Sequence, residues 1–199
     1  MADPRTIRDL AGADPRPHPL SRSAVVMIDA QMEYVSGMLP LTGVEAALEE
    51  GGRLLAAARA IGRPVIHVQH KGNPGGLFDP AGPSFAIADP VAPEGGEPVV
   101  FKGLPNSFSG TELDTVLEGC GADSVVFAGF MTHMCVSSTV RGALDRGIAC
   151  TVLAAACATR DLPDGRGGVV QANDLHRAEL AALSDRFCPI AENLTDLEG

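Results

Sequence analysis

Residues 24–29 read Ala-Val-Val-Met-Ile-Asp, five apolar residues followed at once by an acid. A short apolar run bounded by polar residues is typical of a strand that is buried on both faces, as in a parallel sheet. Comparable runs recur along the chain at residues 64–69, 98–101, 124–128 and 150–153, with a weaker one at 187–190. The sequence therefore predicts six strands, the first of which ends at Asp29.

Longer stretches with helical periodicity separate these runs, at residues 44–61, 111–117, 136–146 and 172–183. Gly51 and Gly52 weaken the first of them, because glycine lowers helix propensity. Strands that alternate with helices imply right-handed crossovers and a sheet covered on both faces. We therefore predict a single-domain α/β protein, a Rossmann-like three-layer α/β/α fold with a mostly parallel six-stranded sheet. Residues 23–199 form this domain, and residues 1–22 form an N-terminal arm that either packs on a neighbour or is loose.

The composition argues against several classes of partner. The 199 residues carry 25 acids and 15 basic residues, for a net charge of −10. Nucleic-acid binding needs a basic stripe, and anionic membranes attract basic surfaces too, so neither partner is expected. No apolar run approaches a membrane span, and the proline-containing start lacks the apolar core of a signal peptide. The five cysteines are odd in number and contain no C-x-x-C pair, which favours a cytoplasmic protein without disulfides or a zinc framework.

Three reactive side chains are predicted to meet at one edge of the sheet. Asp29 follows the first strand, Lys102 follows the third, and the fourth strand leads to Cys135 at the start of a helix. Ligands of open parallel sheets bind outside the carboxyl ends of the strands. Lys102 is one of only two lysines among the 15 basic residues. A helix N-terminus stabilises a thiolate, so we expect the pKa of Cys135 to lie below its free value of ~8.5.

Each of these residues also has an ordinary structural explanation. An acid after a strand is often the first polar residue of a loop, a lone cysteine is often a small buried apolar residue, and a lysine at a strand end can simply reach solvent. It is the convergence of the three that indicates a catalytic site. The long connection at residues 70–96 is rich in proline and glycine, and a loop of that length is more often a functional lid than slack chain.

Four blocks of sequence resemble the isochorismatase-like cysteine hydrolases, a family that includes nicotinamidases, N-carbamoylsarcosine amidases and ureidoacrylate amidases. The resemblance extends over residues 24–190. The blocks are residues 26–31 with Tyr34, residues 99–102 with 106–108 and 111–113, residues 129–136 with 139–141, and residues 156–161. It implies a catalytic triad of Asp29, Lys102 and Cys135, and no cofactor.

The resemblance also implies a mechanism. Asp29 takes the thiol proton of Cys135, Lys102 holds the carboxylate and favours the anionic forms, and the thiolate attacks a carbonyl to form a thioester-type intermediate. The backbone N–H groups of Met131 and Cys135 are expected to form the oxyanion hole, with a cis peptide bond between Phe130 and Met131.

Further residues are candidates for contact with the substrate. They are Gln31, Tyr34, His70, Phe108 and Thr132. Tyr34 is equally well explained as a core aromatic residue, and His70 as a surface histidine at a strand end. Apolar walls for the pocket could come from Phe108, Phe78 and Phe85, although each of these taken singly is better explained as a core residue. His133, two residues before Cys135, suggests a Cys-His dyad, although by resemblance Asp29 is the better base. No metal is expected, because His67 and His70 lie three apart on a strand and face opposite sides, and the Asp-x-His motif of nicotinamidases is missing.

Three functions stay open at this stage. The first is hydrolysis of a small carboxamide, ureido or N-carbamoyl compound, with release of ammonia or an amine. The second is cleavage of an isochorismate-type vinyl ether, which in the resembled family is carried out by members that lack the cysteine. The third is a non-catalytic binding module on the same fold. The expected partners are the small-molecule substrate and, by resemblance, further copies of the chain in a homodimer or homotetramer.

Overall fold

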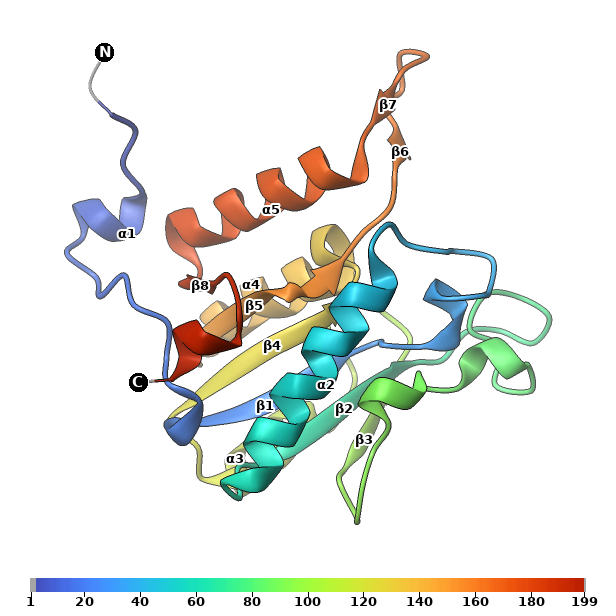
Figure 1. Ribbon diagram of the computed structural model, residues 1–199, viewed down its shortest axis with the longest axis horizontal. Coiled ribbons are helices and arrows are strands. Elements are labelled where there is room, and N and C mark those ends of the chain that lie inside the picture. The colour runs from blue at the N-terminus through green and yellow to red at the C-terminus, as the bar shows by residue number, and fades with distance from the viewer. Residues whose placement is uncertain (1–2, 199) are drawn as a thin grey trace.

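The computed structural model describes residues 3–198 and confirms the α/β class. Six parallel strands form the main sheet in the order β3-β2-β1-β4-β5-β8 (Figure 1). The strands are β1 (Ser23–Ile28), β2 (Val65–His70), β3 (Val99–Lys102), β4 (Ser124–Phe130), β5 (Cys150–Ala158) and β8 (Ile190–Ala191). The strand order runs outward from β1 to β3 on one side and from β4 to β8 on the other, which places the topological switch point between β1 and β4. Ligands bind at such switch points in open α/β sheets.

Helices cover both faces of this sheet. They are α2 (Val44–Ala60), α3 (Leu113–Cys120), α4 (Ser137–Asp145) and α5 (Ala172–Arg186). In Figure 1, α2 crosses the front of the sheet, while α3 and α4 lie behind it. All six residues of β1 are buried: Val25 and Met27 belong to the core shared with α2, and Val26 and Ile28 to the core shared with the other helices. This two-sided burial explains the uninterrupted apolar run in the sequence.

The glycine pair inside α2 has a packing role. A Cβ on Gly52 would lie 2.8 Å from the carbonyl oxygen of Pro90, and one on Gly51 would lie 3.0 Å from Met27 Cε. The helix therefore approaches the sheet and the connection before β3 more closely than larger residues would allow. The two glycines lower the helix propensity of α2 but permit this close contact. The helix still extends over 17 residues.

Several elements differ from the sequence-based expectations. Strand β5 continues to Ala158, five residues beyond the expected end, because an alanine-rich stretch has a weak strand signal but pairs here with the end of β4. The hairpin of β6 (Leu162–Pro163) and β7 (Val169–Val170) was not expected. The last strand of the sheet is shorter and lies later than residues 187–190.

The N-terminal arm packs on its own chain. It contains a short helix, α1 (Ile7–Leu10), which lies near α5 in Figure 1. The backbone N–H of Ile7 donates to Asp185 Oδ1 at 2.7 Å, and that of His18 donates to Thr151 Oγ1 at 2.9 Å. Among the residues described, no helix is both long enough and apolar enough to cross a membrane.

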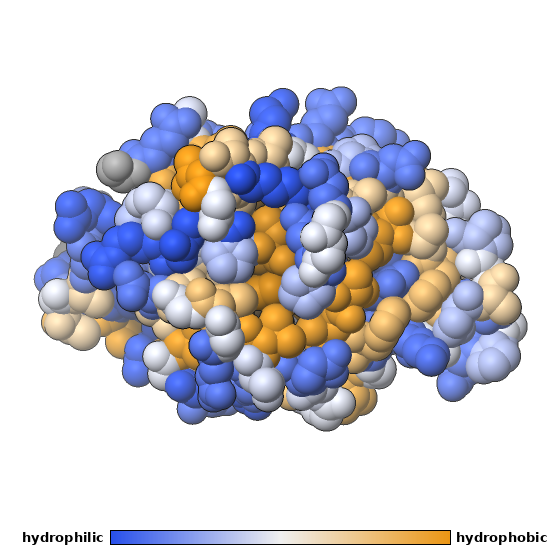
Figure 2. Space-filling model, turned by 90° about the horizontal axis from the view of Figure 1, so that it is seen from below, coloured by the Kyte–Doolittle hydropathy of each residue, from blue (hydrophilic) through white to orange (hydrophobic). Residues whose placement is uncertain are grey.

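The edge strand β3 presents aromatic surface to solvent. Phe101 is 50% exposed and stacks on Phe85, with the ring centroids 6.3 Å apart. Figure 2 views the molecule from below, the side toward which β3 lies in Figure 1, and shows apolar groups across the middle of this face with hydrophilic groups around them. The expected homodimer or homotetramer stays a prediction.

Candidate active site

Asp29 leaves the end of β1 in an unusual backbone conformation. Its φ angle is +49°, in the left-handed region that residues with a Cβ rarely adopt. Its N–H donates to the carbonyl oxygen of Val68 on β2, and its own carbonyl oxygen accepts from the N–H of Gln31. The side chain is completely buried. Such strain persists only where the surroundings enforce it and is common at functional sites.

Lys102 ends the edge strand β3 and places its ammonium beside Asp29. Nζ lies 2.7 Å from Asp29 Oδ2, and neither side chain has any exposed surface. Nζ also donates to the carbonyl oxygen of Leu104 at 3.0 Å and to Cys135 Sγ at 3.2 Å. The ammonium therefore contacts both the candidate base and the candidate nucleophile. Apart from this ion pair, neither carboxylate oxygen of Asp29 has a hydrogen-bond partner within residues 3–198, which leaves lone pairs available for a thiol proton.

Cys135 lies in a single π-helical turn, Thr132–Val136, that connects β4 to α4. Burial, reinforced by the negative charge of Asp29, raises the pKa of the Cys135 thiol to about 12 despite the opposing effect of Lys102. The expectation of a lowered pKa is therefore wrong. Cys135 lies inside the π turn before α4, and desolvation outweighs the helix dipole there. The resting nucleophile is a thiol that needs a base.

The same burial makes Asp29 a stronger base. Desolvation raises the pKa of the Asp29 carboxyl above its usual range, and the ion pair with Lys102 opposes that shift. A proton that moves from Cys135 to Asp29 leaves the site with the same total charge, because one anion replaces the other beside Lys102. Proton transfer inside this dry pocket therefore requires no new uncompensated charge.

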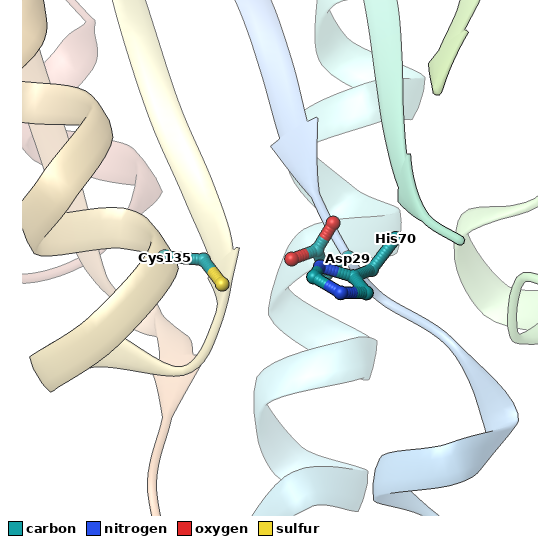
Figure 3. A group of neighbouring side chains, drawn as sticks. All are labelled: Asp29, His70 and Cys135. Atoms are coloured by element: carbon teal, nitrogen blue, oxygen red, sulfur yellow. The ribbon is translucent and has the colours of Figure 1, made fainter. Parts of the chain in front are cut away.

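His70 completes the cluster at the end of β2. Its Nδ1 lies 3.2 Å from Lys102 Nζ, and burial together with that ammonium lowers the pKa of His70 to about 4. A neutral imidazole that accepts from Lys102 at Nδ1 carries its proton on Nε2. Figure 3 shows His70 beside Asp29, with the sulfur of Cys135 directed toward them from the opposite side. Of the four residues in this cluster, His70 is the one that is partly exposed.

The donor set of this cluster does not fit a metal ion well. Asp29, His70 and Cys135 could each offer one ligand atom, all within 4.8 Å of one another. The ammonium of Lys102, however, already contacts all three, and a cation placed among them would be repelled by it. His67 faces the other side of the sheet, where its Nε2 lies 2.9 Å from Glu97 Oε2. The expectation of no metal stays a prediction.

The loop between β4 and Cys135 has the expected backbone geometry. The peptide bond between Phe130 and Met131 is cis, which confirms the prediction. The carbonyl oxygen of Met131 accepts from the N–H groups of Met134 and Val136 and so closes the turn. Met131 and Cys135, the residues expected to supply the oxyanion hole, are both 3% exposed. Their role as donors stays a prediction.

Three of the residues expected to contact the substrate bond or pack against other parts of the protein. The amide of Gln31 bonds the backbone N–H and carbonyl of His70 and the carbonyl of Phe85. The Thr132 hydroxyl donates to Ala158 and bonds His176. Phe108 is buried in the core on the side of α3 and α4, and Arg146 lies 4.5 Å above its ring. Their polar groups or rings already have protein partners, and their assignment to substrate binding stays a prediction.

Tyr34 and His133 are placed differently with respect to the site. Tyr34 is 2% exposed and packs edge-on against Phe78 and Phe130. Burial and the nearby charges of Asp29 and Cys135 raise the pKa of Tyr34, so its hydroxyl stays protonated near the site. The His133 Nδ1 bonds the hydroxyl of Thr159, which gives the imidazole a partner other than the Cys135 thiol.

Two supporting groups escaped sequence analysis. Glu33 is a buried acid whose carboxylate accepts from the backbone N–H groups of Met38 and Phe78. The carbonyl of Leu104 accepts from Lys102. A glutamate among apolar residues was a detectable signal for the first, but a backbone carbonyl carries no sequence signal at all.

Comparison with known proteins identifies a family and a fold for the chain. The sequence profile of the isochorismatase domain matches residues 23–193. A solved isochorismatase from Pseudomonas putida KT2440 superposes with a TM-score of 0.91 at 43% identity, covering 95% of this chain and 97% of that one. The uncharacterized isochorismatase family protein YddQ of Bacillus subtilis is 37% identical over 171 residues, which are 84% of this chain and 94% of that protein.

Other relatives have named activities or locations. Streptothricin hydrolase of Streptomyces noursei is 34% identical over 164 residues (81% of this chain, 65% of that protein), and maleamate amidohydrolase of Pseudomonas putida is 32% identical over 143 residues (63% and 67%). The secreted isochorismatase effector Isc1 of Verticillium dahliae is 36% identical over 183 residues (92% and 94%). Because that relative is secreted, the cytoplasmic location of this chain stays a prediction.

Proposed function

Because the chain belongs to the isochorismatase family of hydrolases, we propose that it is a cysteine-dependent amidohydrolase. Its substrate would be a small carboxamide, ureido or N-carbamoyl compound. The observation that carries this proposal is the position of Lys102 Nζ, in contact with both Asp29 Oδ2 and Cys135 Sγ. The amidohydrolases among its relatives add support.

The reaction would begin with proton transfer from Cys135 to Asp29. The thiolate, held beside Lys102, attacks the carbonyl carbon and forms a C–S bond. Negative charge develops on the carbonyl oxygen, where the backbone N–H groups of Met131 and Cys135 would stabilise it. Asp29 then returns its proton to the departing nitrogen as the C–N bond breaks, and ammonia or an amine leaves.

Water would complete the cycle. It attacks the thioester-type carbonyl and gives a proton to Asp29, which is an anion again after the first half-reaction. The C–S bond breaks, the acid product leaves, and Asp29 returns the proton to the Cys135 sulfur. Lys102 stabilises the negative charge in both steps, because that charge alternates between Asp29 and Cys135 and the ammonium contacts both.

The two alternatives make less use of this arrangement. A vinyl ether hydrolase needs no nucleophilic sulfur, so activity would survive removal of Cys135. A binding module needs neither the buried ion pair nor a base beside a thiol. A buried ion pair is weak support for stability, which favours a chemical role for it.

The test is ammonia release from a panel of small amides, ureido acids and N-carbamoyl compounds. We expect Cys135→Ala, Lys102→Ala and Asp29→Asn to abolish release and Cys120→Ala, which removes a half-buried thiol on α3, to retain it. Mass spectrometry of the parent, quenched during turnover, should show an acyl adduct on the peptide that contains Cys135. Ammonia release that persists in Cys135→Ala would refute the proposal, and cleavage of an isochorismate-type vinyl ether by that variant would favour the ether hydrolase.

A further inference from the structure

The connection between β2 and β3 contains a small closed loop over the catalytic cluster. Residues 73–77 are all exposed, and Phe78, which follows them, is 6% exposed. The N–H of Gly72 donates to the carbonyl of Phe78 at 3.0 Å and closes the neck of the loop. The backbones approach so closely there that a Cβ on Gly72 would lie 1.9 Å from the carbonyl oxygen of Leu77. Compact surface loops with adjoining ends are frequently functional.

One side chain of this loop, that of Phe78, points into the protein and covers His70. The ring centroids of Phe78 and His70 are 4.8 Å apart, and the Phe78 ring also packs edge-on against Tyr34 at 5.3 Å. Asp29, Lys102 and Cys135 are buried, whereas His70 is partly exposed. The Phe78 ring therefore packs against the one residue of this cluster that reaches the surface.

The backbone of Phe78 is held in an unfavourable conformation. Its φ angle is +56°, and apart from Asp29 it is the only non-glycine residue among those described with a positive φ. Its N–H donates to the buried carboxylate of Glu33 at 3.4 Å, a long bond. A residue with a strained backbone whose N–H makes only a long hydrogen bond can leave its place more readily than a residue in a strand or helix.

We propose that Phe78 is the gate to the catalytic thiol and sets the upper size of the group that can reach it. The substrate-size part of this inference rests on the proposed amidohydrolase function. The access part does not, because it concerns the reach of any reagent to Cys135. In the closed state the Phe78 ring covers His70, and displacement of the loop at residues 72–78 opens the route.

The experiment compares two alkylating reagents with the same reactive group. Iodoacetamide and the larger iodoacetanilide both form a C–S bond with release of iodide, and peptide mass spectrometry gives the rate at Cys135 separately from that at Cys120. Opening the gate should raise the Cys135 rate in proportion to the fraction of open molecules. We expect Phe78→Ala to speed iodoacetanilide by about tenfold or more and iodoacetamide by less. Phe78→Leu, which keeps apolar volume and guards against misfolding, should give an intermediate gain.

The matched control is Phe85→Ala, which removes an aromatic ring from the same connection. Phe85 stacks on Phe101 at the sheet edge, and its carbonyl contacts to Gln31 and Gln69 are backbone and survive. The Cys135 rates should then match the parent, and the Cys120 rates should be the same in all variants. Unchanged iodoacetanilide rates in both folded Phe78 variants, or an equal gain in Phe85→Ala, would overturn the gate. Because alkylation needs no turnover, failure of the hydrolase assay leaves this result interpretable.

Discussion

Replacing Lys102 by arginine keeps the positive charge and changes its shape. The ammonium lies between Asp29 Oδ2 at 2.7 Å, Cys135 Sγ at 3.2 Å and the carbonyl of Leu104 at 3.0 Å, in a space with no exposed surface. A planar guanidinium is longer and cannot point donors at three converging partners. A hydrogen bond to a charged group contributes about 1.5–3 kcal/mol. At about 1.4 kcal/mol per factor of ten, loss of the thiolate contact alone corresponds to about 10- to 150-fold in kcat/KM.

Overpacking would also lower the free energy of unfolding, since extra volume in a tight interior costs about 1–3 kcal/mol. We therefore expect Lys102→Arg to lower kcat/KM for ammonia release by about 10- to 150-fold, with a lower Tm. Lys71→Arg is the matched control, because Lys71 is the other lysine and is exposed. Its kinetics and Tm should equal those of the parent. If Lys102→Arg kept activity within about threefold of the parent, the contact between ammonium and thiolate would not carry the catalysis assigned to it.

Further predictions concern protonation and metal. A thiol of pKa about 12 has little thiolate in equilibrium with solvent at neutral pH, so the Cys135 thiolate should form by proton transfer to Asp29, and the rate of its alkylation by iodoacetamide should change little between about pH 7 and pH 9; a rise of about tenfold per pH unit over that range would show that Asp29 does not take the proton. Dialysis against a chelator should leave ammonia release unchanged, and activity lost on chelation and restored by Zn²⁺ would show that Lys102 does not exclude a metal. Burial lowers the pKa of His67, so the unfolded chain binds its proton first and Tm should fall as pH drops below about 6.5. His67→Gln, which keeps a donor for Glu97 but does not titrate, should flatten this fall, and an unchanged pH dependence would assign the loss of stability to other groups.

The backbone arrangement was largely predictable because it follows from local patterns. Apolar runs such as residues 24–28 record two-sided burial, and the rule that ligands bind at strand ends is enough to bring Asp29, Lys102 and Cys135 to one edge of the sheet. The prediction failed where the local strand propensity and the tertiary strand pairing disagree, as in the alanine-rich second half of β5.

Side-chain contacts were less predictable, because they depend on partners distant in sequence. Thr132 bonds His176 and Phe108 packs under Arg146, and no spacing rule connects those positions. The direction of the Cys135 pKa shift was also missed, since it depends on how completely the thiol is desolvated rather than on its place before a helix. Phe78 was a candidate wall among several phenylalanines, and its backbone conformation is what distinguishes it.

The strand that carries Lys102 has a consequence for the whole site. β3 is four residues long and pairs only with β2, so of the three strands that lead to Asp29, Lys102 and Cys135 it has the fewest hydrogen bonds to resist separation from the sheet. Asp29 and Cys135 follow β1 and β4, which are flanked on both sides. If the end of β3 frays from the sheet, the Lys102 ammonium moves away, and the Asp29 carboxyl and the Cys135 thiol are left facing each other in a dry interior without a counterion. The competence of the catalytic centre is therefore limited by the most easily detached part of its scaffold, and hydrogen exchange at Phe101 and Lys102 would report on it directly.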